Sequence, residues 1–138
     1  MANGKMRVLY YSKKSKLKAV ADCLCEKYGL KGDVVPPAYP CENERLLFLV
    51  ATVDKDCPDV LRRFCEEINA KRAQNVALII DGPETTAKLI CKILKDAGSN
   101  PISKIFYCKT GFLKSKLTAE EKDSLLLWAD EAVSSVND

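Results

Sequence analysis

The sequence contains no histidine, the residue that most often serves as a general base or metal ligand. This absence disfavours hydrolytic mechanisms. The seven cysteines include no pair at the CxxC spacing of a zinc or redox site, and we interpret Cys23, Cys65 and Cys91 as small apolar-face thiols. No apolar run is long enough to span a membrane. The first residues, MANGKMR, lack the apolar core of a signal peptide, so we expect a cytoplasmic protein.

The 138 residues suit one domain, 1–138, with a substantial core. Charge is unevenly distributed along them. Residues 1–32 carry eight lysines or arginines and two acids, whereas the remainder carries fourteen and seventeen. The basic residues are not interleaved with aromatic residues and form no nucleic-acid motif, so we consider nucleic acid an unlikely partner.

Apolar runs of strand length alternate with segments of helical periodicity. Pro36 and Pro37 end the second strand, which favours a place at the sheet edge. Thr118 and Glu121 have the spacing of a capping box at the last helix. The segment between the second and third strands is too short and too rich in turn residues for a full helix. The expected strands are 6–11, 32–35, 46–53, 75–80 and 102–108, and the expected helices are 17–28, 58–72, 83–97 and 118–136.

This alternation predicts an α/β fold with a doubly wound, five-stranded parallel sheet and helices on both faces. For strand order 2-1-3-4-5, ligands bind beyond the carboxyl ends of the strands, between the first and third. The loops at that edge are 12–16, 52–57, 81–84 and 109–112.

The first of these loops has the chemistry of an anion site. Ser12, Lys13, Lys14, Ser15 and Lys16 connect a buried strand to the start of a helix. The first helical turn leaves backbone N–H groups unpaired and carries the positive end of the helix dipole. The alternative is that these lysines simply solvate the start of the helix.

MRVLYYSKKSKLKAVADCL resembles the opening of flavodoxin-like proteins, and RLLFLVATV, NVALIIDGPETTAKLICKIL and the helix after KTGF resemble their later units. The resemblance implies that the chain binds FMN and passes electrons to a redox partner, which the basic loop suggests is acidic at the contact. It places Ser12 and Ser15 at the FMN phosphate beside Lys13, Lys14 and Lys16. Residues of the next two loops would also contact FMN, namely Thr52, Val53, Asp54, Asp81 and Gly82.

The chain also departs from that family. Lysines stand where Gly, Thr and Asn are usual in the first loop, and neither 52–57 nor 81–84 contains an aromatic residue to stack on the flavin. Phe112 or Tyr39 are the candidates to replace it, although we favour packing within the loop for each of them. A second hypothesis is therefore a flavodoxin-fold binding or regulatory module that has lost flavin and binds another anion or a protein through its basic loop.

Two other site chemistries are weaker. Cys57 and Arg63 have the spacing of a cysteine phosphatase signature, but Asp59 lies between them and would repel a phosphate. Asp54 and Lys109 invite comparison with phosphorelay receivers, yet the first strand ends in Tyr10, Tyr11 and Ser12 instead of the acids that hold magnesium. We therefore expect an electron carrier rather than a hydrolytic enzyme.

Overall fold

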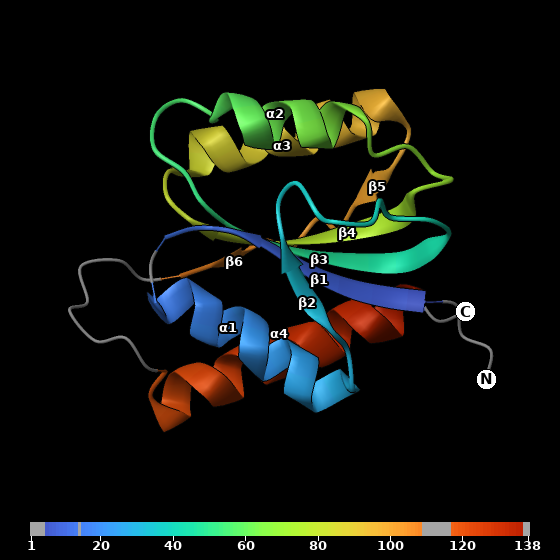
Figure 1. Cartoon of the computed structure of the whole chain (residues 1–138). Coiled ribbons are helices and arrows are strands. Elements are labelled where there is room, and N and C mark those ends of the chain that lie inside the picture. The colour runs from blue at the N-terminus through green and yellow to red at the C-terminus, as the bar shows by residue number, and fades with distance from the viewer. Residues whose placement is uncertain (1–4, 14, 109–116, 137–138) are drawn as a thin grey trace.

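The computed structural model describes residues 5–13, 15–108 and 117–136. In these ranges a parallel sheet lies between two helical layers, with α1 and α4 on one face and α2 and α3 on the other (Figure 1). No helix in the described ranges is both long and apolar enough to cross a membrane. The strands are β1 (Lys5–Tyr11), β2 (Gly32–Val34), β3 (Glu44–Thr52), β4 (Ala73–Asp81), β5 (Asn100–Pro101) and β6 (Phe106–Tyr107), and the helices are α1 (Ser15–Tyr28), α2 (Asp59–Glu66), α3 (Glu84–Ala97) and α4 (Ala119–Val136).

The strand order is β2-β1-β3-β4-β5, with β6 also paired to β4, and all of these pairs are parallel. Val8 of β1 lies beside Phe48 of β3, which lies beside Ala77 of β4. The predicted α/β class and strand order are thus confirmed. Because β1 lies between β2 and β3, the chain crosses the sheet in opposite directions on either side of β1, which places the switch point between β1 and β3.

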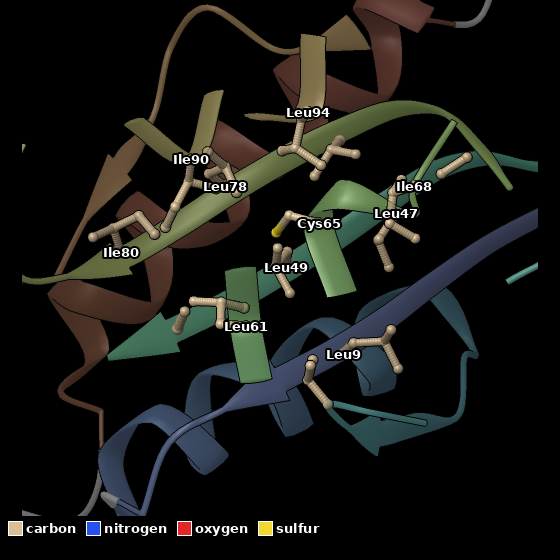
Figure 2. Close-up of a cluster of buried hydrophobic side chains, with 14 of the residues drawn as sticks. Leu9, Leu47, Leu49, Leu61, Cys65, Ile68, Leu78, Ile80, Ile90 and Leu94 are labelled. Carbon is tan, nitrogen blue, oxygen red and sulfur yellow. The ribbon is translucent and has the colours of Figure 1, made fainter. Parts of the chain in front are cut away.

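Strands β3 and β4 are buried on both faces, as their continuous apolar runs predict. Successive side chains of a strand point to opposite faces. Leu47 and Leu49 accordingly join the core under α2 and α3, whereas Phe48 and Val50 join the core over α1 and α4. Figure 2 shows the first of these cores, where labelled side chains from β1, β3 and β4 meet those of α2 and α3.

Aromatic rings organise the opposite core. Phe48 stacks on Tyr28 of α1 with ring centroids 5.9 Å apart, and its ring meets Trp128 of α4 edge-on at 6.1 Å. Phe106 of β6 contacts the same tryptophan at 5.6 Å. Phe48 is therefore the point at which the first and last helices pack on the sheet.

The connection between β2 and β3 contains no helix: residues 35–43, all of which the structure describes, are irregular. This confirms the expected absence of a helix there. The connection rises over the sheet on the side of α2 and α3 (Figure 1). Its residues Val35 and Cys41 are buried in that core, while Tyr39 is 77% exposed. An irregular segment thus covers the face that a helix would otherwise cover.

Only residues 106–107 of the predicted strand 102–108 form a strand, β6. The short strand β5 lies before the predicted range at residues 100–101, with residues 102–105 as an interruption between the two. At both ends the backbone still binds β4, since Ile102 N donates to Val76 O and Cys108 N donates to Ile80 O, each at 2.8 Å. Between these bonds the Lys104 carbonyl accepts a hydrogen bond of 2.9 Å from Trp128 Nε1. A side chain of α4 therefore satisfies a carbonyl within the interruption.

Helix α2 is shorter than predicted, because it ends at Glu66 rather than near Arg72. Asn69 explains the difference. Its Oδ1 accepts hydrogen bonds from the backbone N–H groups of Lys71 and Arg72, at 3.0 and 3.1 Å. Asparagine competes with the helix in this way by bonding its own neighbouring backbone.

Because Phe48 contacts side chains of both α1 and α4, we predict that its ring contributes strongly to stability. Phe48→Ala would remove the ring that contacts both α1 and α4, and we expect it to lower the free energy of unfolding by about 3–5 kcal/mol. The measurement is urea denaturation followed by far-UV circular dichroism. Leu127→Ala is the matched control, because Leu127 lies on α4 and is 66% exposed. A loss for Phe48→Ala no larger than that of the control would contradict this account of the core.

Candidate ligand-binding site

Three of the predicted site residues come together where β1, β3 and β4 end. Ser12 follows β1, Thr52 ends β3 and Asp81 ends β4. The parallel register places Thr52 directly beside Asp81, and Tyr11 beside Ala51. Residues from distant parts of the sequence therefore form one rim at the carboxyl edge of the sheet, as the sheet order predicts.

A chain of hydroxyl groups connects these three strand ends. The Ser12 and Thr52 hydroxyl oxygens lie 2.7 Å apart, and the Thr52 hydroxyl donates to Asp81 Oδ2 at 3.2 Å. Asp81 is 3% exposed. A buried carboxylate is therefore in contact, through one hydroxyl, with the residue predicted to bind phosphate.

The loops after β3 and β4 are joined directly to each other. Val53 N donates to Asp81 O at 2.9 Å, and the Thr86 hydroxyl donates to Asp54 O at 2.6 Å. A Cβ added at Gly82 would lie 2.3 Å from the Val53 carbonyl oxygen, a contact that only glycine avoids. The loop after β3 is thus bonded to the end of β4 through its backbone and to the start of α3 through the Thr86 hydroxyl.

A cavity of about 420 Å³ lies on the β2 side of this rim. Its volume falls within the usual range of small-molecule sites, roughly 300–1,000 Å³. Two tyrosines, a serine and a lysine give it aromatic, hydroxyl and cationic groups. The lining residues are Tyr10, Tyr11, Ser12, Lys13, Val34, Val35 and Thr52.

Sequence reasoning missed the role of Tyr10, Tyr11, Val34 and Val35. The cavity lies where the irregular connection after β2 begins, and Val35 N donates to Tyr10 O at 3.1 Å. Two adjacent aromatic residues at the carboxyl end of the first strand are a signal that could have identified it, because that edge carries the ligand site in doubly wound sheets.

Lys16 contributes to structure as well as to local charge. Its Nζ lies 2.5 Å from Glu121 Oε2 of α4, and its side chain is 11% exposed. Glu121 also completes the predicted capping box, because its Oε1 accepts from Thr118 N at 2.9 Å and its own N–H donates to the Thr118 hydroxyl at 3.1 Å. The hydrogen bond from Lys16, followed by that from Thr118, lowers the pKa of Glu121. This lysine thus binds the start of α1 to the start of α4.

The remaining predicted residues are distributed around the rim. Lys13 is exposed and lines the cavity, whereas Tyr39 is exposed and does not line it. Asp54 is exposed, and its carboxylate accepts a hydrogen bond from Asp56 N at 2.9 Å. Lys14, Lys109, Phe112 and the side chain of Ser15 lie outside the described residues.

Cys57 has the environment of a structural thiol. Burial is the main cause that raises its pKa, and its Sγ lies 3.8 Å from Pro58 O. A nucleophilic cysteine requires the opposite shift, toward the thiolate. Among the described residues, no group of His, Cys, Asp and Glu is arranged to hold a metal ion. The described site therefore offers groups that bind and orient a ligand.

No protein-family model matches the sequence, and no curated protein matches it significantly. Among solved structures, a flavodoxin from the domain Archaea aligns over 97% of this chain and 99% of its own, with a TM-score of 0.63 at 12% identity. Oxidised flavodoxin 2 from Bacillus cereus aligns over 95% of this chain and 98% of its own, with a TM-score of 0.66 at 14% identity. The chain therefore has a flavodoxin-like fold over nearly its whole length.

The ion pair between Lys16 and Glu121 makes stability depend on pH. The pKa of Glu121 is lower in the folded chain than its usual 4.5, so the stabilisation is complete above that usual value and is lost as the pH falls through the lowered one. Glu121→Gln should reduce the free energy of unfolding at pH 7 by on the order of 1 kcal/mol. Denaturant titrations at several pH values should show this difference disappearing in acid.

Glu120→Gln is the control, because it removes a carboxylate from the same helical turn without removing the partner of Lys16. We expect it to change stability less than Glu121→Gln at pH 7. Equal losses for the two variants, or a Glu121→Gln loss that persists undiminished in acid, would contradict a stabilising role for the ion pair.

Proposed function

We propose that this chain binds FMN, or a related phosphorylated flavin, at the rim formed by β1, β3 and β4 and carries electrons to a partner protein. The observation that carries the proposal is the cavity of about 420 Å³, which combines tyrosines with Lys13 and borders the loop that opens α1. The flavin ring would stack on aromatic side chains, and its phosphate would be neutralised by the lysine. The flavodoxin-like fold supports the same location, because ligands of doubly wound sheets bind at the carboxyl edge of the sheet.

Different residues would bind the flavin ring and its phosphate. Tyr10 and Tyr11 both line the cavity, but as neighbours in β1 their side chains point to opposite faces of the sheet. Tyr11, on the same face as Val35, would therefore offer aromatic surface to a planar ring. Lys13 and the positive end of the α1 helix dipole would neutralise a phosphate. When bound, the flavin supplies the redox chemistry, and the protein orients it and limits its contact with water. The exposed lysine also favours a redox partner that is acidic where it docks.

The loops after β3 and β4 favour a second function. They bond to each other through Val53, Asp81, Thr86 and Asp54, and neither contains an aromatic residue. Loops joined in this way leave less room for a ring between them. This observation supports a flavodoxin-fold binding module without flavin, which would use the same basic loop to bind another anion or a protein.

Titration with FMN and with riboflavin separates these functions. We expect FMN to bind saturably at one equivalent, as measured by quenching of flavin fluorescence. Lys13→Ala should weaken FMN about two- to fivefold and leave riboflavin unchanged, because riboflavin lacks the phosphate. Tyr11→Leu should weaken both ligands about two- to tenfold, because both carry the ring.

Lys18→Ala is the control for Lys13→Ala. It removes an exposed lysine of α1 that pairs with Asp22 at 3.4 Å and does not line the cavity. We expect it to leave the affinity for FMN unchanged. If excess FMN gives neither quenching nor a changed absorption spectrum with the wild-type chain, the electron-carrier proposal fails and the binding-module function takes its place.

A further inference from the structure

A second cavity, of about 450 Å³, lies between α3 and the edge of the sheet formed by β5 and β6. Its volume is within the usual range of small-molecule sites, roughly 300–1,000 Å³. This edge is opposite to β2 in the strand order, and no residue that lines this cavity also lines the one beside Tyr10 and Tyr11. The two cavities are therefore separate sites.

One wall of this second cavity is a single line of side chains along α3. Intervals of four, three and four residues separate its members, which are Glu84, Lys88, Cys91 and Lys95. Such spacing places residues on one side of a helix. With a rise of about 1.5 Å per residue, the line is about 16 Å long. A small ligand could therefore lie along it and contact both a charged and an uncharged member.

The opposite wall comes from the interruption between β5 and β6 and from its flanks. Ile102 and Ile105 line the cavity and are partly buried, and Tyr107 lines it with 38% of the residue exposed. Burial raises the pKa of Tyr107, and the charge of Glu84 raises it further, as expected for a tyrosine close to the start of α3. This wall therefore offers an apolar and aromatic surface.

The two ends of the α3 wall differ in charge. Lys88 pairs with Glu84 at 3.8 Å, whereas Lys95 forms no ion pair with any residue that the structure describes. Lys104 also lines the cavity, but its ammonium group pairs with a glutamate of α4 at 3.6 Å. Burial raises the pKa of Cys91, and the charge of Lys95 counteracts that shift. Lys95 is therefore the available cation, and its field reaches the thiol within the cavity.

We propose that this cavity binds a small organic anion, with its carboxylate or phosphate at Lys95 and its apolar body between Cys91 and Tyr107. The apolar body would leave water, and the anion would gain an ammonium partner. The combination of the two walls selects an amphipathic ligand over an inorganic ion. This site is additional to that of the proposed function and does not depend on flavin binding.

Alkylation of Cys91 by iodoacetamide reports whether the cavity is occupied, because a bound ligand covers the thiol. The probe is 1-naphthyl phosphate, which joins an aromatic body to a phosphate. We expect the probe at saturation to slow alkylation of Cys91 about tenfold, as measured by mass spectrometry of the peptide that contains it. Cys25 is the internal control, because it is a similarly half-buried thiol of α1 that does not line the cavity. Its alkylation rate should not change.

Two partial probes separate the contributions of the two walls. Inorganic phosphate has the charge without the aromatic body, and 1-naphthol has the aromatic body without the charge. Each should need a concentration at least about tenfold higher than 1-naphthyl phosphate to protect Cys91. Protection by inorganic phosphate at the same concentration as 1-naphthyl phosphate would overturn the assignment of an apolar body to this site.

Lys95→Glu tests the assigned cation. It should weaken protection by 1-naphthyl phosphate about tenfold, because attraction becomes repulsion. Lys27→Glu is the matched control, since it makes the same change of charge in the last turn of α1, outside the cavity. Lys13→Ala should also leave protection unchanged, because Lys13 lines only the first cavity.

Three results would overturn the proposal. The first is alkylation of Cys91 that the probe leaves unchanged or slows no more than that of Cys25. The second is an equal effect of Lys95→Glu and Lys27→Glu. The third is a loss of protection in Lys13→Ala, which would place the probe in the first cavity. None of these measurements uses flavin, so a failure of FMN binding leaves this test intact.

Discussion

Burial of β3 and β4 on both faces is the constraint on which the rest of the structure depends. Every residue of β3 from Leu46 to Ala51 is fully buried, so each face of the strand needs its own covering layer. Alternating side chains divide the core into two parts, one under α2 and α3 and one over α1 and α4. Because the backbone of these strands has little freedom in such a core, their carboxyl ends hold Thr52 and Asp81 in a fixed relation.

Much of this fold could be predicted from the sequence, because its strands have apolar runs and its helices have apolar faces. The run from Leu46 to Val53 identifies a central strand by composition alone, and the Thr118–Glu121 spacing identifies the start of α4. The errors lie where a distant or competing contact decides the structure. Asn69 ends α2 early by bonding the backbone beyond it, and the indole of Trp128 binds the Lys104 carbonyl within the predicted last strand.

The candidate site could be predicted only in part, for a related reason. Ser12, Thr52 and Asp81 stand at the carboxyl ends of neighbouring parallel strands, so the predicted strand order is enough to place them at one edge of the sheet. Glu121, the ion-pair partner of Lys16, is 105 residues away in the sequence, and no local pattern predicts that contact. The cavity beside Tyr10 and Tyr11 likewise depends on how residues 35–43 pass over the sheet, which their turn-rich composition does not determine.

The ion pair between α1 and α4 also bears on how the chain matures during synthesis. Lys16 belongs to α1 and Glu121 belongs to α4, more than 100 residues later in the sequence. Tyr28 and Asp130 join the same two helices by a hydrogen bond across 102 residues. Translation adds about 5–20 residues per second, so this interval lasts many seconds on a slow ribosome. The ion pair at the start of α1 therefore forms only after α4 has been synthesised and has packed beside α1.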